Sequence, residues 1–202
     1  MNDDKLEELN VDLRDLCCFL ITLFYKTERK YSCCRTKVGK LLSILAFKYA
    51  MNNEKLFNER IYKYDECGTA IEKTGAILYR DEYYEYTYYD GQKKIYDMFN
   101  ESVELPTRWK REINIPLTVM VDTVDVFRKF GAYSKTDLSE VLNPIVDELT
   151  NESYGEIELC KIPLIIDKVD QENKVIQYLK KERISNKVMD HVSGKVKKYK
   201  LW

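Results

Sequence analysis

The sequence predicts a mainly α-helical (α+β) protein: a compact helical domain with a small β-hairpin or short antiparallel sheet. Three observations lead to this class. Leucines recur at spacings of three and four near the start of the chain, which is the pattern of an amphipathic helix. The 202 residues include only seven glycines and four prolines, which leaves little material for long loops. One run of β-forming residues ends in Asp-Gly, a sequence typical of a hairpin turn.

Two helices are expected in the first quarter of the chain. The first spans residues 4–28, whose leucines recur at helical spacing. The second begins after Ser32 or Thr36, either of which can cap it, and ends near Asn52. Its apolar stripe is so wide that this helix should be central and largely buried.

Short strands and turns are expected between these helices and the middle of the chain. Residues 59–64 alternate in polarity as a short strand does. Gly68 marks a turn, and Thr69 is expected to cap a short helix. The β-hairpin is expected near residues 83–98, although its returning arm fits a helix equally well.

Helix signals dominate the following segment. Pro116 suits the first turn of a helix, and Gly131 is a natural residue to follow its last turn. Ser134 and Asp137 have the spacing of a capping box for the next helix. Pro144 should end or kink that helix, because proline lacks the backbone N–H that a helix interior requires.

The last part of the chain differs from the rest in pattern. The run 156–166 alternates at first and is expected to form a strand, and a final helix is expected over residues 170–188. We therefore divide the chain into a helical domain of residues 1–155, which carries the hairpin, and a C-terminal strand and helix extension of residues 156–202 with a basic tail.

Charge is balanced over the whole chain but not along it. There are 33 lysines and arginines against 34 acidic residues, which disfavours a uniformly basic nucleic-acid-binding protein. Residues 180–202 nevertheless hold eight basic and two acidic residues, a net charge of +6. Such a tail suits an acidic partner, RNA or the protein's own acidic body, or it is simply a solvated terminus.

Membrane and export signals are not found in the sequence. No apolar run approaches the ~18 residues that a membrane-spanning helix needs. The acidic start, Met1-Asn2-Asp3-Asp4, is unlike the basic start of a secretory signal peptide. We expect a cytoplasmic protein that does not contact the membrane.

No catalytic pattern emerges from the residue types. The single histidine, His191, lies in the basic tail, and neither of the glycine-rich phosphate-binding motifs is present. Carboxylate pairs such as Asp122 and Asp125 are typical of a solvated helix face. The six cysteines include two adjacent pairs rather than zinc-type spacings, and we expect buried free thiols. We expect no enzyme, no metal and no cofactor.

A run of tyrosines at residues 83–89 is the most unusual feature of the sequence. Successive strand residues face opposite sides, so the rings would line both faces and one set would be exposed. Exposed tyrosines favour a protein-binding surface. Two alternatives are a hairpin that packs both faces within its own fold and a platform for nucleic-acid bases, although the neighbouring acids disfavour phosphate. The candidate partner-binding residues are Tyr83, Tyr84, Tyr86, Tyr88 and Tyr89.

Three segments resemble the Panacea-type antitoxin domain family. The second expected helix is similar to the family's Ser/Thr-x-x-Lys-Leu-x-Lys-Leu-Leu-Tyr-x-Ala helix, and a later segment is similar to its Tyr-Ser-x-x-x-Leu-Ser element. A glycine that the family follows with proline is kept, but Thr69 stands in the proline's place. The family's later His and Pro-Trp are replaced by Asn143-Pro144-Ile145. The matching positions are Lys37, Lys40, Leu41, Leu42, Tyr49, Gly68, Tyr133, Ser134, Leu138 and Ser139.

The resemblance covers roughly residues 8–148 and implies a mostly helical protein-binding domain. Members of the family serve as antitoxins of toxin–antitoxin pairs and occur on prophages, and one relative delivers its toxin to a protease. We therefore expect an antitoxin-like module that neutralises a toxin-like protein partner by direct steric binding. The alternative is a phage- or mobile-element-derived regulator that binds nucleic acid through its basic C-terminal tail.

Overall fold

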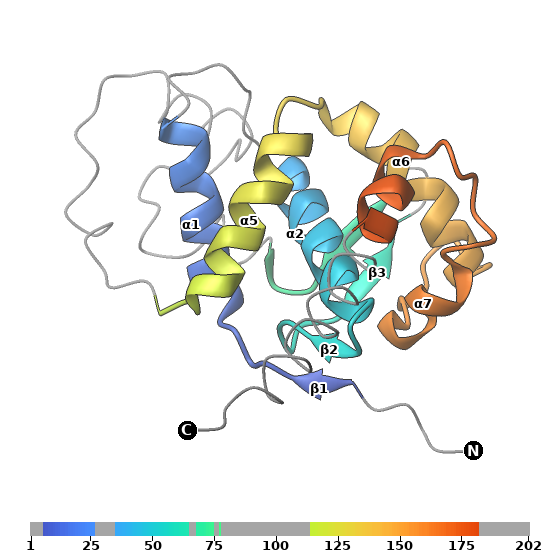
Figure 1. Ribbon diagram of the computed structural model, residues 1–202, viewed down its shortest axis with the longest axis horizontal. Helices are drawn as coiled ribbons and strands as arrows, with labels where there is room; N and C mark the ends of the chain where they lie inside the picture. Colours follow the sequence, from blue (N-terminus) through green and yellow to red (C-terminus); the bar gives the residue numbers. More distant parts are fainter. Residues whose placement is uncertain (1–5, 27–34, 65–67, 75–76, 78–113, 182–202) are drawn as a thin grey trace, which may run out of the picture.

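The computed structural model describes residues 6–26, 35–64, 68–74, 77 and 114–181. The predicted mainly α (α+β) class is confirmed, with helices around one central helix and two separate pairs of short strands (Figure 1). The elements in chain order are β1 (Glu7–Glu8), α1 (Leu13–Lys26), α2 (Arg35–Ala50), β2 (Glu54–Lys55), β3 (Ile61–Lys63), β4 (Thr69–Ile71), α5 (Leu117–Phe130), α6 (Lys135–Leu149), the 3-10 turn η3 (Leu159–Lys161) and α7 (Ile162–Ile165).

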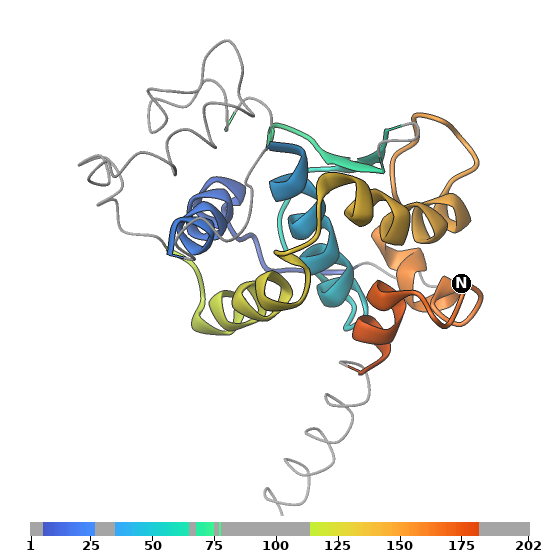
Figure 2. The same ribbon diagram turned by 90° about the horizontal axis from the view of Figure 1, so that it is seen from above.

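Helix α2 is the centre of the fold. Every residue from Lys37 to Ala50 is buried, which confirms the predicted central helix. Helices α1 and α5 lie on one side of it, and α6 and α7 on the other (Figures 1 and 2). From Lys37 onward this helix has no solvated face, so other elements cover it from every direction.

The first helix is shorter than predicted. Instead of spanning residues 4–28, it begins at Leu13, and the residues before it form β1, which pairs in parallel with β2. Asn10 has a φ of 53°, which a helix does not tolerate, and the Asp12 side chain accepts a 2.8 Å hydrogen bond from the backbone N–H of Arg14. Leu6 and Leu9, whose spacing predicted a helix, instead flank β1, and β1 pairs with a strand that is distant in the sequence.

A small sheet lies against α2. The predicted strand over residues 59–64 is confirmed as the shorter β3, which pairs antiparallel with β4. Gly68 forms the predicted turn with a φ of +85°, a value that favours glycine. The predicted start of a helix at Thr69 is wrong, because the turn returns the chain alongside β3 and buries Ile61 beside Ile71. Helical backbone is found only from Thr74, where the N–H of Ile77 donates to the carbonyl oxygen of Lys73 at 2.8 Å.

Residues 155–157 pair with β3 on the side opposite β4. Tyr62 pairs with Glu156, and the backbone N–H of Ile157 donates to the carbonyl oxygen of Ile61 at 2.8 Å. The strand predicted over 156–166 is therefore wrong except for the single bridge residue Glu156, because the chain turns into η3 at Leu159 and α7 at Ile162. Pro163 suits the first turn of α7, where its missing N–H needs no partner.

Helix α5 ends at the predicted glycine, but this glycine is needed for its small size and not for an unusual backbone conformation. Gly131 has a φ of −63°, an ordinary helical value. A Cβ at this position would lie 2.4 Å from the carbonyl oxygen of Phe127. Gly131 is therefore favoured because the chain has no room for a side chain there.

Helix α6 starts as predicted and continues past its proline. The Ser134 hydroxyl accepts a 3.1 Å hydrogen bond from the N–H of Asp137, whose carboxylate accepts one of 2.8 Å from the N–H of Ser134. Pro144 does not end the helix, which runs to Leu149. Buried side chains on both sides of the proline hold the helix against the core, namely Leu138, Leu142, Ile145, Val146 and Leu149.

The described chain closes with a helical segment over residues 174–181, which starts later than the predicted residue 170. The Asn173 side chain caps it by accepting hydrogen bonds from the N–H groups of Val175 at 2.9 Å and Ile176 at 3.3 Å. The expected hairpin near 83–98 lies outside the described residues. In the part of the chain that the structure describes, no helix has the length and apolar character to cross a membrane.

Candidate functional site

Many of the residues singled out in the sequence are outside the described part. Tyr83, Tyr84, Tyr86, Tyr88 and Tyr89 lie there, as does the basic tail from residue 182 onward. Their proposed role in binding stays a prediction. Site geometry therefore has to be built from the remaining candidates and from what the fold brings together.

Three of the positions that resemble the Panacea pattern, Lys40, Gly68 and Ser139, meet around the buried amine of Lys40. Lys40 of α2 donates from Nζ to the carbonyl oxygen of Lys135 at 2.9 Å and to the hydroxyl of Ser139, both on α6. Gly68 lies beside it, since a Cβ there would be 3.6 Å from the Lys40 Nζ and 3.1 Å from the Asn143 Oδ1. Residues far apart in sequence thus form one polar cluster between α2, α6 and the small sheet.

A second polar cluster links α2 to α5. Lys48 and Tyr49 each donate to one carboxylate oxygen of Asp122, both at 2.8 Å. Burial, and then the hydrogen bond to Asp122, raise the pKa of the Tyr49 hydroxyl well above its ordinary value. This cluster and the one around Lys40 hold helices together.

The other matched positions also serve the interior. Leu41, Leu42 and Leu138 are fully buried. Lys37 is buried as well, with its Nζ 5.1 Å from the ring centroid of Phe24. Tyr133 packs edge-on against Phe130, with ring centroids 5.6 Å apart.

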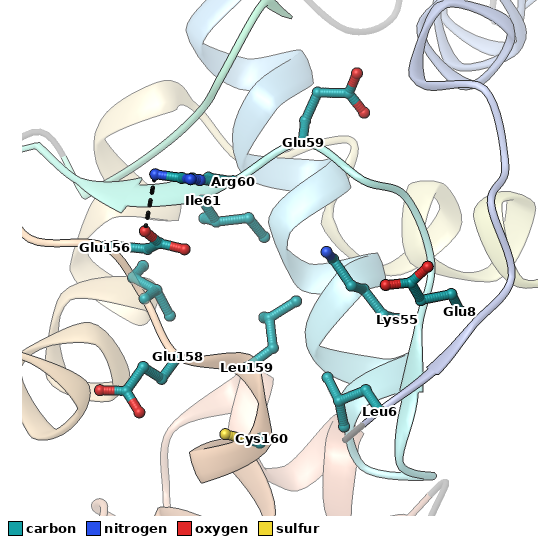
Figure 3. A pocket seen from close by; sticks show the side chains of 11 residues that line it. Leu6, Glu8, Lys55, Glu59, Arg60, Ile61, Glu156, Glu158, Leu159 and Cys160 are labelled. Carbon is teal, nitrogen blue, oxygen red and sulfur yellow. Dashed lines mark ion pairs between the residues drawn. The ribbon is translucent and has the colours of Figure 1, made fainter. Parts of the chain in front are cut away.

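The described surface is hollowed where β2, β3 and the turn η3 meet (Figure 3). This groove has a volume of about 270 Å³. Sequence reasoning missed it, because its walls come from three separate parts of the chain. The residues that line it are Leu6, Glu8, Lys55, Glu59, Arg60, Ile61, Glu156, Ile157, Glu158, Leu159 and Cys160.

Apolar and charged side chains contribute different parts of the groove. Leu6, Ile61 and Leu159 are among its apolar lining, and Leu159 lies near the centre in Figure 3. Arg60 and Glu156 form an ion pair at one side, with 3.5 Å between Nη1 and Oε2. An apolar lining with a charged rim is the usual arrangement of a protein-binding surface.

Arg60 of the groove is also close to a group of tyrosines that we call the tyrosine face: half-buried Tyr62 on β3, exposed Tyr64 just after it, and exposed Tyr154 in a turn. Tyr64 is 53 % exposed and Tyr154 is 62 % exposed, and their rings meet edge-to-face with centroids 5.2 Å apart. Arg60 borders the face, and a hydrogen bond with Tyr62 and the charge of Glu156 raise the pKa of its guanidinium.

The sequence held part of the signal for this face. The alternation over residues 59–64 places Tyr62 and Tyr64 on the side of the strand opposite the buried Ile61. Tyr154 carried no signal, because only the folded chain brings it next to Tyr64. Local pattern therefore identified the strand but not the surface that it helps to build.

Three cysteines lie in the described part of the chain, and Cys17 and Cys160 are free thiols there. Cys17 is buried, and that burial raises the pKa of its thiol. Cys18 and Cys160 are half-buried. Within the described residues, no three or more histidine, cysteine or acidic side chains are grouped so as to hold a metal ion.

The chain matches no protein-family model, no curated protein and no solved structure. The resemblance to the Panacea-type family stays a hypothesis from the sequence.

Proposed function

We propose that the protein is an antitoxin-like protein-binding module that neutralises a toxin-like partner by direct steric contact. The observation that carries the proposal is the tyrosine face, bordered by Arg60 and adjoining a groove with an apolar lining. Tyrosine and arginine are enriched among the residues that contribute most to protein–protein binding. We take the tyrosine face as the contact surface, with the tyrosines of residues 83–89 as further candidates.

The face is also held in place before any partner arrives. Tyr62 belongs to β3, which is hydrogen-bonded on one side to β4 and on the other to residues 155–157. Side chains on a hydrogen-bonded sheet lose less freedom on binding than side chains on an unpaired loop. Preorganisation of this kind raises affinity without additional contacts.

Capture of the partner from the native host tests the proposal. The tagged full-length protein is used at low and high salt, and bound proteins are identified by mass spectrometry. We expect one small stoichiometric partner that is retained at high salt and that arrests growth when it is produced alone. Production of the full-length protein should relieve that arrest.

A matched pair of variants connects the capture to the tyrosine face. Tyr64→Ser with Tyr154→Ser should reduce partner capture about tenfold or more, as loss of interface hot spots does. Leu117→Ser with Leu164→Ser is the control, because it also removes exposed apolar side chains but from α5 and α7. Tyr84→Ser, Tyr86→Ser and Tyr88→Ser together test the tyrosine run separately. Equal capture by wild type and by both tyrosine variants contradicts the proposal.

The alternative is that the basic tail binds nucleic acid. It predicts recovery of RNA or ribosomal proteins only, with binding that falls steeply as salt rises. That result would replace the proposed antitoxin-like role with the regulatory one.

A further inference from the structure

Helix α5 carries a second apolar face, on the side that points away from the core. Its inner face is buried through Val119, Val126 and Phe127, whereas Leu117 is 75 % exposed and Val121 is 59 % exposed. Leu117 and Val121 are four positions apart, so they lie on the same face of the helix. Apolar side chains that gather on one exposed face are typical of a surface that another segment covers.

A second groove lies along this exposed face, and we call it the α5 groove. Its volume is about 550 Å³. Six of its seven lining residues belong to α5, so it is open on one side and suits a chain segment laid along the helix better than an enclosed small molecule. The lining residues are Lys48, Met120, Val121, Asp122, Val124, Asp125 and Arg128.

The described chain ends next to the α5 groove. Its last helical segment places the ring centroid of Tyr178 5.7 Å from the Nζ of Lys48, which lines the groove, and 4.9 Å from the Nζ of Lys129 on α5. Figure 2 shows this segment (red) and α5 (yellow-green) on the same side of α2. Residues 182–202 therefore follow within about one helical turn of Tyr178, and their 21 residues are long enough to run the length of the groove.

Residues 182–202 carry the kinds of side chain that this groove requires. Ile184, Val188, Val192 and Val196 recur at every fourth position, which is the spacing of an amphipathic segment. Six basic and two acidic residues give the same segment a net charge of +4. Because the segment is attached beside the groove, its effective concentration there is on the order of millimolar, so even a weak contact holds it in place.

Charge follows the same order along the tail and along α5. Where the described chain ends, α5 presents the exposed cations Arg128 and Lys129. Farther from that end, Asp125 forms no ion pair with any residue that the structure describes. The tail begins with Glu182, and four of its lysines lie within residues 195–200. A tail that runs along the groove therefore brings its acidic start to the basic end of α5 and its lysines toward the acidic part.

The negative charge beside the groove is not neutralised by neighbouring cations. Asp122 is paired with Lys48, but it is close enough to Glu54 for their charges to interact, and Glu54 stands directly opposite Glu7 in the β1–β2 pairing. Partial burial, and then Glu7 and Asp122, raise the pKa of Glu54. Neither Glu7 nor Glu54 has an ion pair within the described ranges. A lysine brought here would offset the repulsion between like charges.

We propose that residues 182–202 fold back and bind in the α5 groove, with their aliphatic side chains on Val121 and their lysines beside Asp125 and Glu54. The occupant is thus the protein's own tail. This inference goes beyond the proposed function, which uses the tyrosine face. It also implies that RNA or an acidic partner reaches the tail only when the tail leaves α5.

Carbodiimide coupling of the full-length protein tests the inference without any substitution. The reagent joins a lysine amine to a carboxylate only where the two groups touch, and mass spectrometry identifies the linked residues. We expect links from the lysines of residues 195–200 to Asp125, Glu54 or Glu7, and fewer of them as salt rises, because salt screens exposed charges. Unlabelled and isotope-labelled protein are mixed, so that links within one molecule are distinguished from links between copies.

The last residue of the chain, Trp202, gives a second readout. Trp109→Phe makes it the only tryptophan, and quenching of its fluorescence by acrylamide measures how exposed the tail is. Val121→Ser should raise the quenching constant about twofold, because it removes an apolar contact of the groove. Leu164→Ser is the matched control, since it removes an exposed apolar side chain from α7, and it should leave quenching unchanged. Circular dichroism and thermal unfolding verify that each variant is folded.

A change in the tail should have the same effect as the change in the groove. Lys195→Glu, Lys197→Glu and Lys198→Glu together reverse the charge that faces the acidic part of α5. We expect this variant to raise the quenching constant of Trp202 about twofold and to lose the carbodiimide links that wild type forms.

Several outcomes would overturn the inference. Links from the tail mainly to the acidic residues of α6 would place it on another surface, and links mainly between copies would make a second molecule the occupant. Equal quenching of Trp202 in the reference protein and in the Val121→Ser variant would show that the tail does not use this groove. None of these results affects the proposed function, whose test depends on Tyr64 and Tyr154.

Discussion

Two sets of charged side chains in this protein lie in opposite environments. Lys40 and Lys48 of α2 are buried between helices and donate to Ser139 and Asp122. The ion pair of Arg60 and Glu156 at the groove is exposed instead, with 61 % and 50 % of the two side chains accessible. Both sets are charged, but they contribute to different properties of the molecule.

The difference teaches where a charge affects stability and where it affects recognition. A buried lysine without an acceptor is strongly unfavourable, so each interior contact is needed for folding. A rim charge is solvated with or without its neighbour, so its removal changes the free energy of unfolding little. The interior set should therefore control stability, and the groove set should control binding.

Removal of Asp122 should have the largest effect. Asp122→Ala leaves the Lys48 amine and the Tyr49 hydroxyl without their carboxylate acceptor. We expect a loss of about 2–3 kcal/mol in the free energy of unfolding, below the full value for a buried pair because Asp122 is partly exposed. Urea denaturation measures it. Asp125→Ala on the same helix is the control and should change stability by about 0.5 kcal/mol or less; equal losses would contradict the comparison.

Substitution of Glu54 should change the free energy of unfolding less than substitution of Asp122, and should increase it. Partial burial, and then the nearby carboxylates of Glu7 and Asp122, raise its pKa from 4.5. The folded protein therefore holds this proton more tightly than the unfolded chain, and stability falls as the pH rises through that raised pKa. Glu54→Gln removes the unfavourable charge and should stabilise the protein at pH 7 by up to about 1 kcal/mol.

The pH dependence of Glu54→Gln provides its own check. The gain in stability should shrink as the pH is lowered toward 4.5, where wild-type Glu54 becomes protonated. Glu8→Gln is the control, because Glu8 stands opposite Lys55 rather than another acid. A gain that is independent of pH would show that charge at Glu54 is not its cause.

The smallest change in stability is expected in the groove. Arg60→Gln breaks the ion pair with Glu156, yet both side chains are at least half exposed. We expect a change below about 0.5 kcal/mol in the free energy of unfolding. A loss of stability comparable with that of Asp122→Ala would remove the distinction between the two sets.

Local patterns were sufficient for the elements whose partners are near in sequence. The wide apolar stripe predicted the buried α2, the spacing of Ser134 and Asp137 predicted the capped start of α6, and Gly68 predicted a turn. The cap of α6 and the turn at Gly68 depend on contacts within a few residues. For α2, the width of the apolar stripe indicates how much of the helix surface is buried.

Tertiary pairing decided the elements that the local pattern misassigned. The leucines near residue 6 have helical spacing, but β1 forms because its backbone hydrogen-bonds to residues 53–56. The segment after Thr69 carries a cap signal, but it pairs with β3. Pro144 stays within α6 because buried side chains on either side of it hold the helix to the core.

The amino-acid sequence alone determined the fold class and the central place of α2, because helical periodicity and width of the apolar stripe are properties of the chain itself. Only the tertiary structure brought Tyr154 next to Tyr64, enclosed the groove between β2, β3 and η3, and placed Asp122 beside Lys48. Those contacts join residues that are distant in sequence, and no local pattern encodes which distant surfaces will meet.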